Sequence, residues 1–447
     1  MAQGQSTSGP GGLRALYPWY VVFVLTLAYT CSFIDRQILT LLIEPIRRDL
    51  VITDTQMSLL GGLAFSILYT TMGIPLARLA DRSNRRNLMT AGVGLWSLMT
   101  AACGLARGFW PLFGARVGVG VGEAALSPAA FSLLADYFRP QQLARAIGAY
   151  STGVYFGAGL ALMIGGAVIQ RVSNAPNQVL PFIGEIFPWQ LTFFVVGLLG
   201  LPIMLLMLTI REPARRGAAV TPVSSGTPAL LAFMRANRAT LVCHIGAFTL
   251  YGIAIGCYLF WSPSVMMRTH GWDAPRTGFT IGLLMFVLGT LGVFSGGWLA
   301  DRLAQRGHRD AVLRAGLYGV LLGAPFIVAT PLLEDDRWAT ASLGFAIYFL
   351  AFLQGLPGAA LQLVTPNPLR AQMTAIYFFI GNLIANGLGP SIPALLADYL
   401  FVDPLKLGLA LSWTTAVVVP LAGLLLFLGL APYRASLARV ADPVSVP

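Results

Sequence analysis

Long apolar stretches separated by short polar ones run through almost the whole chain. A helix needs about 20 mostly apolar residues to cross the hydrocarbon core of a bilayer. Stretches of this length recur along the sequence and predict twelve membrane-spanning helices. The approximate predicted spans are 17–43, 57–79, 87–106, 111–135, 144–169, 189–210, 239–262, 277–300, 311–331, 340–364, 371–396 and 407–430.

The longest polar interruption runs from Arg211 to Thr240 and is rich in Pro, Gly, Ser and Arg. It separates two groups of six predicted helices, so we expect an all-α integral membrane protein built from two six-helix bundles. The predicted parts are a cytoplasmic N-terminal tail (1–16), an N-terminal bundle (17–210), a cytoplasmic linker (211–238), a C-terminal bundle (239–430) and a cytoplasmic C-terminal tail (431–447).

Composition agrees with this class, since 56% of the residues are hydrophobic and only 11% are charged. The net charge is +11, but the basic residues are scattered through short connections, which argues against a nucleic-acid partner. With both termini in the cytoplasm, most Lys and Arg residues fall on the inside, as the positive-inside rule requires. We therefore expect a multi-pass protein of a bacterial inner (plasma) membrane, embedded in the lipid bilayer as a monomer.

Four charged residues lie deep inside predicted helices, away from the ends of the spans, where an uncompensated charge is costly. Asp35 and Arg36 are adjacent in helix 1, while Arg116 and Glu123 lie two turns apart on one face of helix 4. Helix 1 runs outward and helix 4 inward, and a rise of about 1.5 Å per residue places Asp35 and Arg36 between the levels of Arg116 and Glu123. Side chains tilt toward the N-terminus of their own helix, so Arg36 reaches inward and Glu123 reaches outward. We predict two ion pairs, Asp35 with Arg116 and Arg36 with Glu123.

Two interpretations of these charges remain open: a permanent ion network between the helices, or a group that couples transport to protons. Buried pairs add little stability relative to apolar replacements, which favours coupling. Glu123 is the first candidate for taking up a proton, because removal from water disfavours its charged form while Arg36 opposes this effect. Asp35 is the second candidate. Arg36 and Arg116 would offer cationic partners to an anionic substrate group.

Several short motifs carry a resemblance to known transporters. "LADRSNRR" follows helix 2, "LADRLAQR" follows helix 8 at the equivalent place of the second half, and "RVGVGVGE" lies in helix 4. The first resembles the helix 2–3 signature of the major facilitator superfamily, and the third resembles its helix 4 motif. "FIDRQ" together with "GEAALSP" resembles the Spinster family of lysolipid and sphingolipid transporters. The resemblance implies two pseudo-symmetric six-helix bundles around a central pathway.

The repeated motif suggests a conformational latch. The two-fold arrangement of this superfamily would place Asp81 near the start of helix 11 and Asp301 near the start of helix 5, where acids can dock on the positive end of a helix. Such contacts would close the cytoplasmic side in one state. The alternative is a solvated basic loop. The predicted latch residues are Asp81, Arg82, Arg85, Arg86, Asp301 and Arg302.

The C-terminal half has no acid inside its predicted helices away from their ends. Its polar candidates for lining a cavity are also candidates for hydrogen bonds between helices. They are Tyr251, Gln354, Asn382 and Asn386, while His244 is expected to pack in the interior instead of carrying a proton. A charged half beside an apolar half would form an amphipathic cavity.

These features predict a secondary active transporter that works by alternating access, is coupled to protons, and moves an amphipathic substrate of the lysophospholipid or sphingolipid type or a related organic anion. The alternatives are a multidrug or small-solute exporter and, less favoured, a lipid scramblase or channel. The sequence lacks the HExxH, GxSxG and P-loop motifs, so we expect no enzymatic activity. Its cysteines show no metal-binding spacing, and we expect no metal and no cofactor besides a proton gradient.

Overall fold

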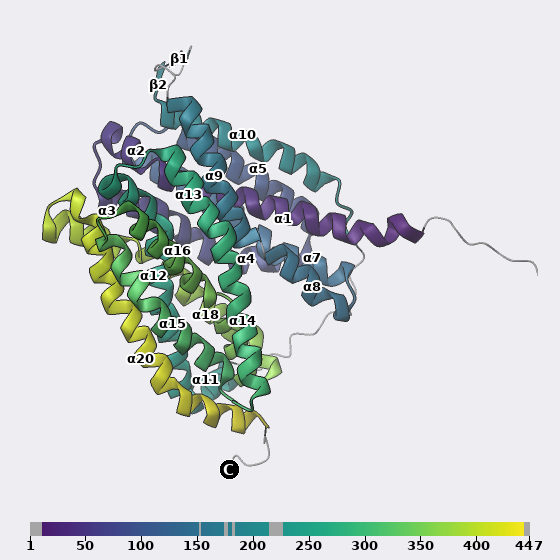
Figure 1. Cartoon of the computed structure of the whole chain (residues 1–447). Coiled ribbons are helices and arrows are strands. Elements are labelled where there is room, and N and C mark those ends of the chain that lie inside the picture. The colour runs from purple at the N-terminus through teal and green to yellow at the C-terminus, as the bar shows by residue number, and fades with distance from the viewer. Residues whose placement is uncertain (1–10, 152, 174–177, 181–183, 214–226, 442–447) are drawn as a thin grey trace, which may run out of the picture.

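The structure, a computed structural model, describes residues 11–151, 153–173, 178–180, 184–213 and 227–441. It is almost entirely helical, and its long helices run side by side in two groups (Figure 1). We use "terminal side" for the side where α1 (Gly11–Leu41) begins and α20 (Leu407–Ala441) ends. The opposite side, where α1 ends and α20 begins, is the "distal side".

Two halves of the chain supply the two groups of helices. The N-terminal half contains α1, α2 (Ile43–Leu50), α3 (Asp54–Ser58), η1 (Leu59–Leu63), α4 (Ala64–Arg82), α5 (Arg85–Cys103), α6 (Phe109–Ala124), α7 (Leu126–Tyr137), α8 (Pro140–Ser151), α9 (Gly153–Ser173), β1 (Gln178–Leu180), β2 (Gly184–Ile186) and α10 (Pro188–Leu208). The C-terminal half contains α11 (Thr227–Ala236), α12 (Arg238–His270), α13 (Ala274–Leu284), η2 (Met285–Gly289), α14 (Thr290–Gln305), α15 (Ala311–Ala329), η3 (Thr330–Leu332), α16 (Asp336–Phe352), α17 (Leu356–Val364), η4 (Asn367–Leu369), α18 (Arg370–Gly381), η5 (Asn382–Leu388), α19 (Ser391–Leu395), η6 (Leu396–Phe401), η7 (Pro404–Lys406) and α20.

Each half has six spans, and several spans consist of two or more labelled helices in line, such as α6 with α7. Ten helical segments of the described chain are long and apolar enough to cross a bilayer. The other two spans include α4 and α5, which have 19 residues each and therefore extend about 28 Å. The prediction of twelve spans in two groups is confirmed.

The ends of some elements differ from the sequence prediction. α1 begins within the segment assigned to the N-terminal tail, and α20 continues into the segment assigned to the C-terminal tail. The linker contains the helix α11, while its residues 214–226 lie outside the described part of the chain. The short antiparallel hairpin of β1 and β2, between α9 and α10, was not predicted.

The hydrophobic core joins the two halves on the distal side. Ile38 and Phe193 of the N-terminal half belong to the same buried cluster as Tyr258 and Trp261 of the C-terminal half. Toward the terminal side the N-terminal half has a separate cluster of its own, which includes Trp96. The halves are therefore packed together distally and have separate cores toward the terminal side.

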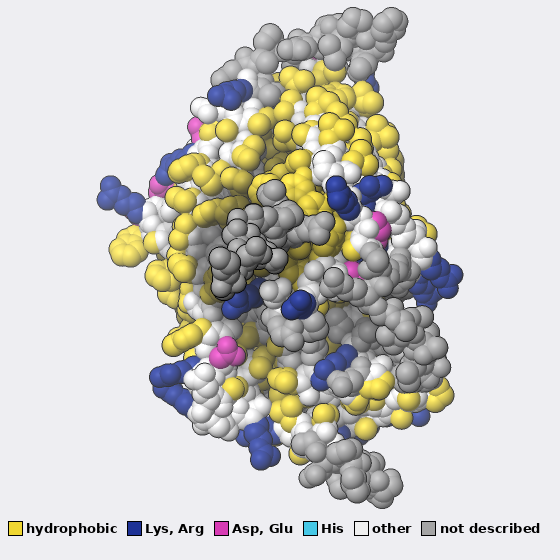
Figure 2. Space-filling model, turned by 90° about the vertical axis from the view of Figure 1, so that its right-hand side faces the viewer, with side chains coloured by type: hydrophobic (Ala, Val, Ile, Leu, Met, Phe, Trp, Pro, Cys, Tyr) yellow, Lys and Arg dark blue, Asp and Glu magenta, His cyan; other side chains and the backbone are white. Residues whose placement is uncertain are grey.

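Figure 2 shows the face of the molecule that is on the right in Figure 1. Hydrophobic side chains lie in the middle of this face, with basic side chains around them.

Glycines allow the distal contact between the halves to be close. α9 packs against α13, and a Cβ on Gly159 would lie 2.5 Å from the carbonyl oxygen of Gly282. η1 packs against η5, and a Cβ on Gly62 would lie 2.5 Å from the carbonyl oxygen of Gly387. Small residues permit such close approach of membrane helices. The two seams thus depend on the absence of side chains at these positions.

Candidate functional site

The centre of the N-terminal half holds an ion pair between α1 and α6. Arg36 Nε donates to Glu123 Oε2 at 2.7 Å, and Arg36 Nη2 donates to the same oxygen. The Glu123 side chain is 1% exposed, whereas that of Arg36 is 24% exposed. Arg36 therefore neutralises a buried carboxylate while part of its own side chain remains accessible.

Three aromatic rings surround the guanidinium of Arg36. Its Cζ atom lies 4.3 Å from the ring centroid of Phe65, 5.0 Å from that of Tyr69 and 5.1 Å from that of Phe33. A cation over an aromatic face is stabilised by the ring quadrupole, more strongly where water is excluded. These rings, from α1 and α4, hold the positive charge in place independently of Glu123.

The second predicted pair, Asp35 with Arg116, is not formed as a direct ion pair. Both side chains are buried, each 1% exposed, but Arg116 Nη1 donates to the backbone carbonyl of Asp35 at 3.2 Å. The prediction was wrong because the depth of a residue in the membrane does not determine whether its side chain or its backbone faces the neighbouring helix. Asp35 Oδ1, Arg116 Nε and Glu123 Oε1 have no hydrogen-bond partner among the described residues. The group of four charges is thus close together but incompletely bonded.

Glycines in α6 bring the neighbouring helices close to this group. A Cβ on Gly120 would overlap the carbonyl oxygen of Phe65, and one on Gly122 would lie 2.6 Å from the backbone nitrogen of Trp96. Phe65 is one of the rings against Arg36. The glycine pattern of "RVGVGVGE" therefore allows α4 and α5 to pack directly on the helix that carries Arg116 and Glu123.

The motif residue Arg85 lies in a contact that the sequence analysis did not predict. Its side chain is 1% exposed and pairs with Asp136 at 2.5 Å and with Glu212 at 2.7 Å. The backbone N–H of Arg86 also donates to Glu212. The contacts of Arg85 connect α5 with the end of α7 and with the start of the linker just after α10, and they do not reach the other half.

The remaining latch residues do not join the halves in this conformation. Arg82, Asp301 and Arg302 are exposed, and no hydrogen bond or ion pair connects their side chains to another residue of the described chain. The side chain of Asp81 lies outside the described part of the structure. The latch therefore stays a prediction about another conformation.

The polar candidates of the C-terminal half have mixed surroundings. The buried Tyr251 donates to the carbonyl of Phe349 at 2.8 Å, which makes it a contact between helices. Asn386 donates to Asn382 at 3.0 Å, and Asn386 is exposed. Gln354 is exposed as well. The buried His244 packs against the rings of Phe248 and Tyr377, as expected.

The distal side carries an ion group that the sequence analysis missed. Arg268, at the end of α12, pairs with Asp54 of α3 and with Glu44 of α2. Thr53 and Gln56 form a capping box at the start of α3. The pattern "TDTQ" has the spacing of a capping box, and it could have indicated that a helix begins at Asp54.

The comparisons with known proteins identify the family. The model of the Major Facilitator Superfamily matches residues 25–390. The chain belongs to the major facilitator superfamily. Members of this superfamily are membrane transporters, so the protein is a multi-pass transporter and not an enzyme.

Similar proteins within the superfamily include Spinster proteins. Protein spinster of Drosophila melanogaster is 25% identical over 330 residues, which cover 71% of this chain and 51% of that protein. A bacterial homolog of the human lysosomal transporter Spinster, in an inward-facing and occupied conformation, has a TM-score of 0.74 and 26% identity, covering 94% of this chain and 97% of that one. An MFS-type efflux pump of Mycolicibacterium smegmatis is 29% identical over 425 residues, 93% of each chain. The resemblance to the Spinster family is confirmed.

Proposed function

We propose that this superfamily member is a proton-coupled transporter of amphipathic anions, with lysophospholipid-type or sphingolipid-type molecules as its leading substrates. The observation that carries the proposal is the arrangement of Arg36, which is partly accessible, ringed by aromatic side chains and bound to the buried Glu123. A cation with apolar rings around it suits a substrate that has an anionic group and an apolar chain.

Coupling follows from competition for Arg36. An anionic group that binds Arg36 competes with Glu123 for its positive charge, and a displaced Glu123 would be a buried carboxylate without its cation. A proton on Glu123 removes that penalty and frees Arg36 for the substrate. Asp35 has no direct cationic partner, so we propose it as a second proton-binding group of the same cluster, with Arg116 compensating its charge at longer range.

The conformation is proposed to be inward-facing, with the terminal side and both termini in the cytoplasm of a bacterial cell. The shared distal core and the exposed Asp301 and Arg302 support this proposal, because a cytoplasmic latch would be open in such a state. The Spinster homolog of similar structure is described as inward-facing. In the outward-facing state the proposed latch would form through Asp81 and Asp301. We propose a monomer as the working unit.

Export of drugs or small solutes is the second candidate function, because a relative at 29% identity is described as an efflux pump. Purified protein in liposomes distinguishes the two candidates. Uptake of labelled lysophospholipids, sphingoid phosphates and cationic dyes is measured with and without an imposed pH gradient. We expect the anionic amphipathic molecules to be transported, and Arg36→Lys to retain more of this transport than Arg36→Gln. Transport of the cationic dyes alone, with equal activity of both variants, would favour efflux.

A further inference from the structure

Arg268 connects the two halves at the distal side. Its Nη1 donates to Asp54 Oδ2 at 2.6 Å and its Nη2 to Asp54 Oδ1 at 2.7 Å, while its Nε donates to Glu44 at 2.7 Å. The Arg268 side chain is 7% exposed and that of Asp54 is fully buried. A bidentate, buried pair of this kind is among the stronger polar contacts in proteins. Opening the distal side must separate these two residues, because they belong to different halves.

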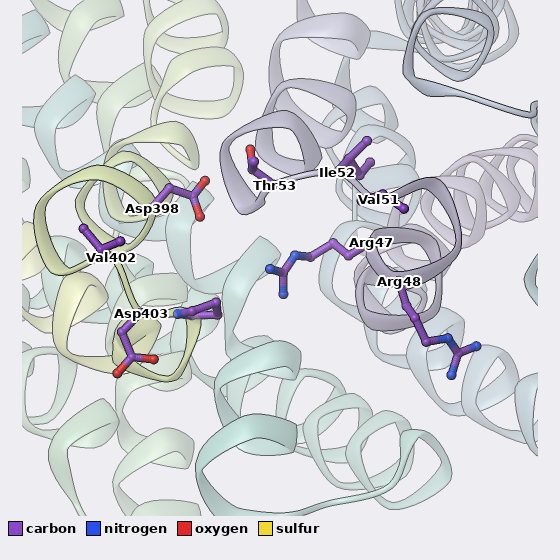
Figure 3. A pocket seen from close by; sticks show the side chains of 9 residues that line it. Arg47, Arg48, Val51, Ile52, Thr53, Asp398, Val402 and Asp403 are labelled. Carbon is purple, nitrogen blue, oxygen red and sulfur yellow. The ribbon is translucent and has the colours of Figure 1, made fainter.

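A second arginine contacts the same carboxylate from within the N-terminal half. Arg47 Nε lies 3.0 Å from Asp54 Oδ1, and this pair would move as one body when the halves separate. Figure 3 shows Arg47 projecting from α2 toward the C-terminal half, into a pocket of about 470 Å³ lined from one half by residues such as Val51 and from the other by residues such as Val402. The Arg47 Nε atom has no well-aligned hydrogen bond among the described residues. Arg47 is therefore near Asp54 but does not hold it as Arg268 does.

We infer that Asp54 exchanges its partner Arg268 for Arg47 when the distal side opens. Removing one partner of a buried pair leaves an uncompensated charge, which is strongly unfavourable. With Arg47 attached to the same half, Asp54 keeps a cation in both conformations. Arg268 remains at the end of its helix, where opening gives it access to water. The exchange lowers the cost of opening, so Arg268 favours the closed distal side and Arg47 favours the open one.

Glu44 is also shared by the two arginines, since it pairs with Arg268 and lies 3.6 Å from Arg47 Nη1, but its side chain is 38% exposed and can be rehydrated. Two further contacts across this side involve hydroxyl groups. Thr55 donates through its backbone and its hydroxyl to Asp398, both at 2.7 Å, and the Ser58 and Ser391 hydroxyls lie 2.9 Å apart. Opening breaks these bonds, but their hydroxyls and the partly exposed Asp398 can be rehydrated. Asp54 is the group for which a replacement partner matters.

The test measures how often the distal side opens. The reporter is Ser391→Cys, because Ser391 is 7% exposed in the closed seam. Every variant also carries Cys243→Ser, because Cys243 is the native cysteine that is partly exposed. The other three native cysteines are buried. A membrane-impermeant thiol reagent is applied to sealed vesicles in which Val51→Cys, 89% exposed on the distal side, reacts rapidly. The rate at Ser391→Cys then follows the open population, and no substrate is required.

The two arginines should have opposite effects. Arg268→Gln should raise the labelling rate about tenfold or more, while Arg47→Gln should lower it by a similar factor. Arg48→Gln is the matched control, because Arg48 is 77% exposed and pairs only with its neighbour Asp49 among the described residues. It should leave the rate unchanged. Asp54→Asn removes the charge that needs a partner. The double variant Asp54→Asn/Arg47→Gln should therefore be labelled as fast as Asp54→Asn alone.

The result that would overturn the inference is a wild-type or faster rate in Arg47→Gln, since Asp54 would then need no second partner. An unchanged rate in Arg268→Gln would overturn it equally. The inference rests on opening and closing of the two sides and goes beyond the proposed substrate and proton coupling. If the transport assays in liposomes contradicted the proposed substrate or the proton coupling, the labelling rates would not change. Failure of the proposed function and failure of this inference can therefore be distinguished.

Discussion

The two halves of the molecule stabilise their interiors with different polar contacts. The N-terminal half buries charges, with Arg36 bound to Glu123 and with Asp35 and Arg116 close by. The C-terminal half uses neutral donors from aromatic side chains to backbone carbonyls: Tyr251 to Phe349, Tyr258 to Ile327, Trp261 to Pro390 and Tyr433 to Ala360. Neutral bonds do not change with a proton gradient. In the proposed mechanism, the N-terminal half therefore contains the group that responds to protons, and the C-terminal half is a scaffold.

The halves also differ in the ion groups at their terminal side. At the terminal side the buried cation Arg85 is bound by Asp136 and Glu212, whereas in the C-terminal half the buried anion Asp310 lies 2.6 Å from Arg314 and 3.6 Å from Arg434. Both groups connect the third span of a half with its sixth. The two halves thus use an ion group between the same two spans, but with a buried cation in one half and a buried anion in the other.

The largest effect should follow from Arg36→Ala. The substitution leaves Glu123 buried without its cation, which costs about 3–5 kcal/mol, and removes the proposed anion partner. We expect lower thermal stability of the purified protein and loss of transport. Adding Glu123→Gln should restore the stability without restoring transport of anionic substrates. If the double variant transported them normally, Arg36 would have only a structural role.

Arg85→Gln compared with Arg314→Gln should sharpen the comparison of the two terminal-side groups. Arg85 is 1% exposed and has two acidic partners, while Arg314 is 27% exposed and has one. We expect Arg85→Gln to destabilise by about 3 kcal/mol or more and Arg314→Gln by about 1 kcal/mol. Denaturation of both variants in the same detergent measures this. Equal effects would mean that burial does not set the strength of these contacts.

The twelve spans and the two halves could be predicted because length and hydrophobicity alone determine whether a helix can cross a bilayer. The pairing of Arg36 with Glu123 could be predicted from depth and helix direction. The partners of Arg116 and Arg85 could not, because they depend on side-chain rotation and on residues far away in the sequence, such as Glu212. The contacts of Arg268 could not be predicted either, because a single charge at the end of a span is typical of an ordinary interfacial residue.

Replacing a glycine of the distal seam by alanine should destabilise the closed distal side more than the same replacement elsewhere. In Gly159→Ala the new methyl group would lie 2.5 Å from the carbonyl oxygen of Gly282, so the closed distal side should be disfavoured by about 1–3 kcal/mol. Gly73→Ala is the control, because a Cβ there meets no atom within 4 Å. Labelling of Ser391→Cys from the distal side should be faster in Gly159→Ala only. Equal rates would show that the seam adapts to the extra methyl group.

The smallest effect on transport is expected in the C-terminal scaffold. Tyr251→Phe removes one hydrogen bond, to the carbonyl of Phe349, and should cost about 1 kcal/mol, which is typical of a single hydrogen bond. The response of transport to a pH gradient should be unchanged. A loss of that response in Tyr251→Phe would contradict the division into a responsive half and a scaffold.

The most direct test of that division is the response of Glu123→Gln to a pH gradient. Uptake of a labelled lysophospholipid into liposomes is compared for the wild-type protein and the variant, with and without the gradient, alongside exchange of labelled for unlabelled lysophospholipid at equal pH. Glutamine resembles the protonated acid, so we predict that exchange persists while acceleration by the gradient is lost. Acceleration of the variant to the wild-type extent would contradict proton coupling through Glu123 and leave the buried charges as a structural network.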